Sequence, residues 1–354
     1  YLLISYLKRP VMNEITIIKP DDWHLHFRDQ DMLLETVPAT ARCFERAVVM
    51  PNLVPPVTTA ELALSYKERI LAARPAGSSF MPIMTIYLTD KTTVQDIKDA
   101  KKAGVLAAKM YPAGATTNSD SGVNSLESLY PVFEALADND MLLLIHGEVT
   151  QKHIDIFDRE KEFIDQHMVK IVARVPKLKV VFEHITTKDA ADFVLSARDG
   201  VAATITPQHL LLNRNDMLDG GMRPHNYCLP VLKRSTHQEA LRAVVKSGSP
   251  KFFLGTDSAP HAKHRKESDC GCAGCYSAWS ALELYTQVFD ELGALDKLEG
   301  FASLYGADFY GLPRNTETVT LVREEWEVPA SITLPNGEPI VPFFAGKKVA
   351  WKLK

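Results

Sequence analysis

Histidine, lysine and aspartate side chains follow several apolar runs of this sequence, at the point where each run ends. Imidazole nitrogens and carboxylate oxygens are good ligands for zinc. A lysine inside an apolar run needs a partner or a modification, because a free ammonium is costly to bury. If these side chains converge in the fold, they predict a metal centre. They are His24 and His26 in DWHLHFR, Lys109 in AAKMY, His146 after LLLI, His184 after VVFE, and Asp257 in FFLGTDSAPH.

Each of these histidines, taken alone, is more often a hydrogen-bonded structural residue than a metal ligand. The HxH pair at His24 and His26 is only moderately specific, since solvent-facing histidines at a strand end would explain it equally well. The combination is more informative, because four histidines, a lysine and an aspartate would all lie at the same end of separate strands. We therefore favour a metal centre over unrelated structural roles.

Eight short apolar runs with helix-like segments between most of them predict the elements that position these residues. This alternation indicates a closed (β/α)8 barrel, whose chemistry lies at the carboxyl ends of its strands. Beyond Tyr310 the pattern gives way to Pro-rich and charged sequence, which we interpret as a C-terminal tail packed on the barrel. The expected strands are Glu14–Lys19, Ala47–Met50, Met81–Leu88, Val105–Met110, Met141–Ile145, Lys179–Phe182, Val201–Ile205 and Lys251–Leu254, and expected helices include Ala60–Ala73, Thr93–Ala103, Leu126–Ala137 and Ala240–Ser247.

Length, charge and cysteine content limit the domain organisation, the partners and the cellular compartment that fit this sequence. No linker or low-complexity tract interrupts the 354 residues, so we expect one domain over residues 12–354 and regard residues 1–11 as leader or added sequence. A net charge of −4 offers no basic field for nucleic acid or an anionic membrane. Five cysteines, three of them crowded into Cys270, Cys272 and Cys275, do not form a secreted disulfide framework and favour a reducing cytoplasm.

The motifs together resemble the amidohydrolase superfamily, with HxH on the first strand, Lys on the fourth, His on the fifth and sixth, and Asp on the eighth. More narrowly, the segments DWHLH, MPNL, KMYP, HGE, FEHITT and GTDSAPH are similar to the short, monofunctional bacterial dihydroorotases. The resemblance runs from about Lys19 to Leu312 and shows no departure at a functional position.

The resemblance implies a binuclear zinc site. In such a site the lysine is carbamylated by carbon dioxide, which replaces an ammonium without a lone pair by two anionic oxygens. Two ions ~3.5–4 Å apart can polarise a carbonyl and supply hydroxide near neutral pH. The implied ligands are His24, His26 and Asp257 for one ion, His146 and His184 for the other, and N6-carboxylated Lys109 bridging both.

The resemblance also implies the reversible cyclisation of N-carbamoyl-L-aspartate to L-dihydroorotate in pyrimidine biosynthesis, with Asp257 as the proton carrier and a homodimer as the assembly. Arg28 can clamp the ring carboxylate, because a guanidinium binds carboxylates bidentately. The loop Pro112–Ser119 would fold over the substrate. The implied substrate contacts are Arg28, Asn52 and His261 at the carboxylate, the backbone of Leu229 and Ala273 at the pyrimidine edge, and Thr116 and Thr117 in the loop.

Other readings of the same residues remain open. A hydantoinase or allantoinase would share the metal ligands, but Arg28, Asn52 and His261 favour a ring with a carboxylate. A mononuclear deaminase would leave Lys109 buried without a task. From other classes, Cys270, Cys272 and Cys275 could hold a metal in a regulatory module, although no second CxxC motif supports this. An inactive barrel that serves as a scaffold would be expected to have lost at least one ligand, and none is missing.

Overall fold

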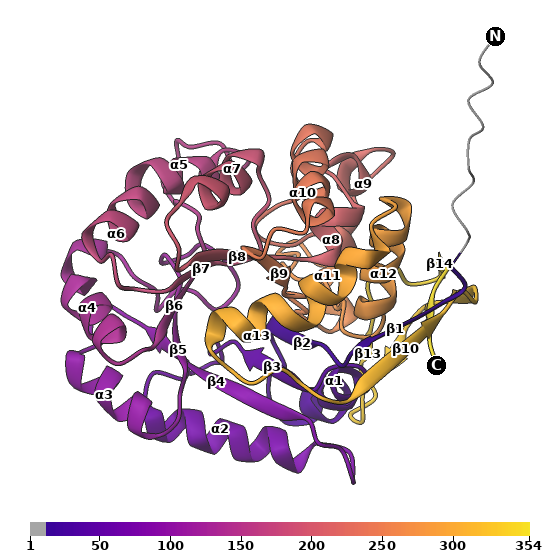
Figure 1. Ribbon diagram of the computed structural model, residues 1–354, viewed down its shortest axis with the longest axis horizontal. Coiled ribbons are helices and arrows are strands. Elements are labelled where there is room, and N and C mark those ends of the chain that lie inside the picture. Colours follow the sequence, from indigo (N-terminus) through magenta and orange to yellow (C-terminus); the bar gives the residue numbers. More distant parts are fainter. Residues whose placement is uncertain (1–11) are drawn as a thin grey trace.

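A computed structural model describes residues 12–354 and shows an eight-stranded parallel barrel (Figure 1). The strands follow one another around the barrel in chain order, from β2 to β9. The predicted (β/α)8 architecture is therefore confirmed. The barrel strands are β2 (Asp21–Leu25), β3 (Arg46–Val49), β4 (Met81–Leu88), β5 (Ala107–Met110), β6 (Leu142–Ile145), β7 (Val180–Phe182), β8 (Val201–Ile205) and β9 (Phe252–Leu254).

The barrel closes where the segment after β9 meets the first barrel strand. Leu25 forms a parallel bridge with Ser258, and the N–H of Asp257 donates to the carbonyl of His24 at 2.8 Å. The register between β2 and β3 shifts between Asp22 and Leu25. Such an irregularity re-aims side chains next to a functional site. Here it allows Trp23 to join the apolar interior while His24 and His26 both face the site.

Helices surround the strands, and several begin at a threonine that caps the helix. The hydroxyls of Thr59, Thr93, Thr187 and Thr206 accept backbone N–H groups of the first turn, which satisfies donors that the helix cannot. The α-helices are α1 (Leu33–Ala41), α2 (Ala60–Ala72), α3 (Val94–Lys102), α4 (Tyr130–Asp138), α5 (Arg159–Phe163), α6 (Val169–Arg174), α7 (Lys188–Ser196), α8 (Pro207–Leu211), α9 (Asn215–Leu218), α10 (Ser235–Ser247), α11 (Lys263–Lys266), α12 (Ala281–Glu291) and α13 (Tyr305–Tyr310). Short 3-10 or π turns lie at Gln30–Met32, Leu126–Leu129, Ile164–Met168, Pro224–Asn226, Leu295–Lys297 and Gly300–Leu304.

The barrel interior is apolar at the end opposite the site. Its side chains include Leu142, Leu144 and Phe253, while alternate residues of the same strands pack outward against the helices. Helix α13 covers this end, where Tyr310 stacks on Trp23 with ring centroids 4.4 Å apart. This packed layer forms the base beneath the polar groups at the carboxyl ends of the strands.

One sequence expectation needs correction. The predicted first barrel strand, Glu14–Lys19, is instead β1 (Glu14–Ile18), which pairs antiparallel with β10 outside the barrel. The first barrel strand is instead β2, with the sequence DDWHL. It contains three ionisable residues and a bulge, so it lacks the apolar composition by which the other strands were predicted. The C-terminal segment packs beside the barrel as expected, and it forms small antiparallel sheets there. Its strands are β10 (Thr318–Val322), β11 (Trp326–Glu327), β12 (Ile332–Thr333), β13 (Pro339–Ile340), β14 (Lys348–Val349) and β15 (Lys352–Leu353).

The interpretation of residues 1–11 as leader or added sequence concerns a segment outside the described residues. Within residues 12–354, no helix combines the length and apolarity needed to cross a membrane.

Candidate metal centre

The carboxyl ends of five barrel strands bring the six predicted ligand residues together. His24 lies in β2 with His26 just after it, and Lys109 lies in β5. His146 follows β6, His184 follows β7 and Asp257 follows β9. All six side chains are buried, and none is more than 8% exposed. The convergence expected from the sequence is therefore what the fold produces.

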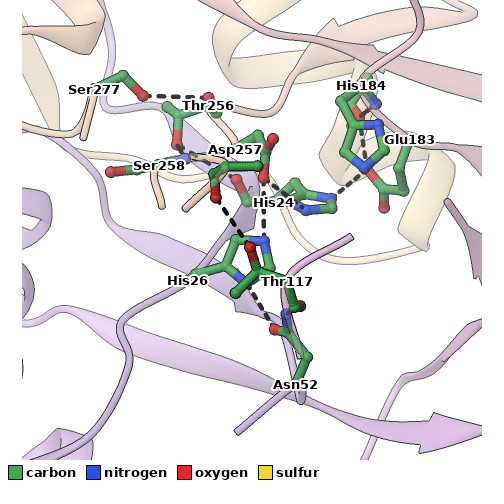
Figure 2. A network of polar contacts seen from close by, with 12 residues as sticks. His24, His26, Asn52, Thr117, Glu183, His184, Thr256, Asp257, Ser258 and Ser277 are labelled. Atoms are coloured by element: carbon green, nitrogen blue, oxygen red, sulfur yellow. Dashed lines mark hydrogen bonds and ion pairs between the residues drawn. The ribbon is translucent and has the colours of Figure 1, made fainter. Parts of the chain in front are cut away.

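His24, His26 and Asp257 form one half of the cluster (Figure 2). One oxygen of Asp257, Oδ1, lies 3.3 Å from Nε2 of His24 and 3.1 Å from Nε2 of His26. One candidate ligand atom from each of the three residues lies within 4.8 Å of the others. A catalytic zinc ion typically has three protein ligands and leaves its fourth coordination position to water or substrate. The three atoms found here match that number.

His146 and His184 form the other half of the cluster. Their ring centroids lie 4.8 Å apart, and the ring of His184 lies 4.9 Å from that of His24. The backbone of His184 has a φ of 40° and that of Asp257 a φ of 46°. Left-handed conformations at residues other than glycine cost energy and often occur at functional sites.

Lys109 lies on the inner face of β5, two residues after the inward-facing Ala107. Its Nζ atom is 5.0 Å from the centre of the Tyr111 ring and has no hydrogen-bond partner in the described chain. Burial lowers the pKa of Lys109 to about 8, although Glu183 and Asp257 oppose the shift. A lysine with this pKa is partly a neutral amine near neutral pH, which is the form that can react with an electrophile.

Burial also keeps most of the imidazoles neutral. It lowers the pKa of His26 to about 4, moves the pKa of His146 downward, and depresses that of His184 strongly. His24 differs: burial and Lys109 lower its pKa, but Glu183 and Asp257 outweigh them and the net shift is upward. Burial alone would raise the pKa of Asp257, yet contacts with His24 and His26 hold it well below its usual range. A neutral imidazole and an ionised carboxylate are the forms that bind metals.

Three residues behind the histidines orient the rings. Glu183 Oε2 lies 2.9 Å from Nδ1 of His24, Glu148 Oε2 lies 2.8 Å from Nε2 of His146, and Asn52 Oδ1 lies 2.7 Å from Nδ1 of His26. Sequence reasoning gave Glu148 and Glu183 no role and placed Asn52 at the substrate. The sequence did contain a signal for the two glutamates, because each lies within two positions of a predicted histidine ligand, His146 or His184. Partners of this kind fix which imidazole nitrogen faces a metal.

A small cavity of about 20 Å³ lies above the cluster. Six of the seven predicted substrate contacts line it, namely Arg28, Asn52, Thr116, Thr117, Leu229 and Ala273. The seventh, His261, lies behind Arg28 and Ala273.

Arg28 and His261 give one wall of the cavity a positive, hydrogen-bonding character. The Nε of Arg28 donates to the carbonyl of Pro260 at 3.1 Å. Nε2 of His261 lies 3.0 Å from both Nη2 of Arg28 and the carbonyl oxygen of Ala273. Nε2 of His261 can either accept a hydrogen bond from Nη2 of Arg28 or donate one to the Ala273 carbonyl, but it cannot do both at once. Burial and the charge of Arg28 lower the pKa of His261 to about 2, so its ring is neutral.

The loop after β5 reaches over the cavity and contacts the opposite wall. The hydroxyl of Thr117 donates to the Ala273 carbonyl at 3.3 Å, and Nδ2 of Asn52 donates to the Thr117 carbonyl at 3.1 Å. These contacts join segments that follow the second, fourth and eighth barrel strands. The loop therefore lies in a closed position.

The side chains present fit a metal centre. Within residues 12–354, the buried polar atoms of the cluster that have no hydrogen-bond partner include Nδ1 of His184 and Nζ of Lys109. Buried polar atoms are normally paired, so a shared gap of this kind needs an explanation. Imidazoles, a carboxylate and a modifiable lysine form a ligand set that zinc accepts.

The cysteine cluster does not form a comparable site. Cys272 and Cys275 are buried, Cys270 is exposed, and all five cysteines are free. In the part of the chain that the structure describes, His24, His26 and Asp257 are the only His, Cys, Asp or Glu group arranged closely enough for a metal. Cys272 and Cys275 belong instead to the loop that places Ala273 and Gly274 at the cavity.

Comparison with known proteins identifies relatives that match the chain along almost all its length. The model of the amidohydrolase family matches residues 16–321. A dihydroorotase of Marinomonas sp. (strain MWYL1) is 94% identical over 97% of this chain and 100% of its own length. A dihydroorotase of Shewanella halifaxensis (strain HAW-EB4) is 76% identical over 97% of this chain and 99% of its own.

Solved structures with the same fold include two more dihydroorotases. The enzyme of Campylobacter jejuni is 36% identical, with a TM-score of 0.89 over 97% of this chain and 98% of its own. The enzyme of Saccharomyces cerevisiae, solved in complex with 5-fluoroorotic acid, is 32% identical, with a TM-score of 0.90 over 97% of this chain and 99% of its own. An L-hydantoinase from Arthrobacter aurescens is only 17% identical, with a TM-score of 0.81, and shares the fold alone.

Proposed function

Because the chain belongs to the amidohydrolase family and is a dihydroorotase, we propose that its buried cluster of histidines, Lys109 and Asp257 is the catalytic centre. Dihydroorotases interconvert N-carbamoyl-L-aspartate and L-dihydroorotate in pyrimidine biosynthesis. In the hydrolytic direction they cleave a cyclic amide C–N bond. The observation that carries the proposal is the buried convergence of these side chains, in which Nζ of Lys109 and Nδ1 of His184 have no hydrogen-bond partner in the described chain.

We propose two zinc ions as the metals. His24, His26 and Asp257 would hold one ion, and His146 and His184 the other. Carbamylated Lys109 would join them, formed when its neutral amine attacks carbon dioxide and loses a proton. When bound, the ions supply Lewis acidity toward the amide carbonyl and a source of hydroxide near neutral pH.

Asp257 would carry the proton in both directions. During hydrolysis it accepts the proton released as water adds to the ring carbonyl, and it returns this proton to the leaving ring nitrogen. In ring closure the ureido nitrogen attacks the side-chain carboxyl carbon. Asp257 takes a proton from that nitrogen and delivers it to the departing oxygen, and a second proton taken up from solvent lets this oxygen leave as water. Its low pKa keeps it ionised and ready to accept.

The carboxylate of the ring would bind at Arg28, Asn52 and His261. Nε of Arg28 is engaged by Pro260 and Nη2 lies 3.0 Å from Nε2 of His261, which leaves Nη1 and the second N–H of Nη2 for the ligand. An amide nitrogen carries two N–H donors, so Asn52 can bind the Thr117 carbonyl and the ligand together. The yeast relative with 5-fluoroorotic acid, a pyrimidine with a carboxylate, supports this substrate class.

The ureido side of the ring, which is not cleaved, would bind the backbone at Leu229 and Ala273. The Ala273 carbonyl already accepts from Thr117. Its N–H has no acceptor in residues 12–354, although Ala273 is buried and lines the cavity. A free donor at the cavity wall suits the ureido carbonyl. Thr116 and Thr117 would close the site and exclude water.

We further propose that residues 12–354 act as one domain, in a homodimer working in the cytoplasm. The five free cysteines and the net charge of −4 support a reducing compartment and small-molecule substrates rather than nucleic acid. The dimer rests on the resemblance of the sequence motifs to the short bacterial enzymes.

Elemental analysis combined with a dihydroorotate hydrolysis assay tests the metal centre. We expect two divalent ions per chain in active protein, a lower content and lost activity in His184→Asn, and no change in His153→Asn. His153 is an exposed histidine and serves as the matched control. One ion per chain in fully active protein would refute the binuclear proposal.

A further inference from the structure

A second buried lysine, Lys266, lies outside the metal cluster at the end of α11. Its side chain is only 3% exposed. Its Nζ atom donates to three main-chain carbonyls, those of Tyr227 at 2.8 Å, Cys272 at 2.8 Å and Gly274 at 2.7 Å. An ammonium has three N–H donors. All three are used, which offsets the cost of burying the charge.

The three acceptors flank the backbone proposed to bind the ring. Cys272 and Gly274 stand on either side of Ala273, and Tyr227 precedes Leu229 by two positions. The N–H of Gly274 also donates to the Tyr227 carbonyl at 3.0 Å. One ammonium therefore ties together two segments that are more than forty residues apart and line the same cavity.

Peptide geometry links this ammonium to the free donor of Ala273. The Cys272 carbonyl and the Ala273 N–H belong to one planar trans peptide, so they point in opposite directions. Because Lys266 holds the carbonyl, it fixes the direction of that N–H on the other side. Gly274 next to it cannot be replaced easily, since a Cβ there would lie 2.5 Å from the Ala259 carbonyl.

We propose that Lys266 is a positioning residue for substrate recognition, which holds the Ala273 N–H and the Tyr227–Leu229 segment where they bind the ureido side of the ring. The inference rests on the proposed function, because it assumes that these backbone groups contact the ring. Lys266 itself is not among the residues that line the cavity. Loss of Lys266 would therefore weaken substrate binding and would not slow the chemical step.

The expected signature is a change in KM without an equal change in kcat. The ureido group is not cleaved, so contacts to it are the same in the ground state and the transition state. Loss of such uniform binding raises KM and leaves kcat nearly unchanged. A residue that only stabilised the fold would instead lower the amount of active enzyme, which reduces apparent kcat and leaves KM unaltered.

The test compares Lys266→Met with Lys263→Met in the full-length, metal-loaded enzyme. Methionine keeps much of the length of the side chain but has no ammonium, and Lys263 is a largely exposed lysine on the same short helix. For Lys266→Met we expect KM for dihydroorotate to rise at least ~10-fold, with kcat within ~3-fold and metal content unchanged. Lys263→Met should match the parent enzyme.

Hydrogen exchange provides a readout that needs no substrate. Peptides covering residues 227–230 and 272–275 should exchange faster in Lys266→Met than in Lys263→Met. If Lys266→Met does not fold, Lys266→Arg keeps a cation with several donors and should show a smaller rise in KM with the same exchange pattern. Normal KM in the variants that fold overturns the proposal.

The two readouts separate this inference from the proposed function. Faster exchange together with unchanged KM would mean that Lys266 holds these segments but that they do not bind the ring, which overturns the inference. Failure of the proposed catalytic centre would appear differently, as absent metal or absent dihydroorotate hydrolysis in the parent enzyme.

Discussion

Replacing Glu160 by glutamine should loosen the segment that carries His184. Glu160 lies in α5 and is fully buried. Its Oε1 accepts the N–H and hydroxyl of Thr187 at 2.8 and 2.6 Å, and its Oε2 accepts the N–H and hydroxyl of Thr186, both at 2.9 Å. Burial raises the pKa of Glu160, while these four donors favour the ionised form. The carboxylate thus anchors Thr186 and Thr187, which come directly after His184 and Ile185 in the chain.

A glutamine amide cannot satisfy the same four donors. With its NH2 group in place of Oε1, the Thr187 N–H loses its acceptor. With the NH2 group in place of Oε2, the Thr186 N–H keeps only a longer contact of 3.1 Å. An unpaired buried donor costs about 1–3 kcal/mol, and loss of the charge weakens the remaining hydrogen bonds by about 1 kcal/mol. We expect the free energy of unfolding of the metal-free protein to fall by about 2–4 kcal/mol.

Denaturant unfolding and a metal-buffer titration check this prediction. Because outer partners of metal ligands typically contribute 10–100-fold to metal affinity, we expect Glu160→Gln to weaken the binding of one ion by about that factor. Glu162→Gln makes the same chemical change in the same helix at a half-buried position and should match the parent protein. If Glu160→Gln retains the parent's stability and metal affinity, the anchoring role is wrong.

The other predictions concern the reaction itself. Lys109→Ala should abolish dihydroorotate hydrolysis, and millimolar short carboxylic acids should restore part of it in steady-state assays; full activity without additives would exclude the carbamate. Asp257→Asn should lower kcat far more than it weakens binding of a ring carboxylate inhibitor, because an amide cannot accept the proton. Equal losses would point to a structural role. Thr116→Val combined with Thr117→Val should reduce kcat at least ~10²-fold at unchanged metal content, and near-normal turnover would make the loop a passive connector.

The sequence was sufficient to predict the barrel because its signal is local. Apolar runs such as Leu142–Ile145 and Phe252–Leu254 can only be buried on both faces, and the segments between them have helical periodicity. Once the barrel is predicted, the carboxyl ends of the strands must meet, so His146 and Lys109 could be assigned to one site without coordinates.

The first strand was misplaced because its identity depends on distant partners. Residues 14–18 have the composition of a strand and do form one, but β10 pairs with it some 300 residues later in the chain. The polar segment Asp21–Leu25 belongs to the barrel because buried groups satisfy it: Asp22 accepts the N–H and hydroxyl of Thr256 at 2.9 and 2.6 Å. No local pattern reveals such a partner.

Residue types and spacing by themselves predicted the barrel and the candidate ligands, and the resemblance of the motifs to dihydroorotases added the expectation of a carboxylated ring. Only the tertiary structure decided how the ligands are held. Val181 faces the barrel interior, so strand alternation would send Glu183 inward and His184 outward. The left-handed backbone at His184 brings both to the site, where Glu183 supports His24. The same holds for Lys266, which lies among charged residues in the sequence and is nevertheless buried. Its burial depends on three carbonyls that converge from two loops, and such convergence of backbone groups leaves no trace in the types of the residues that supply them.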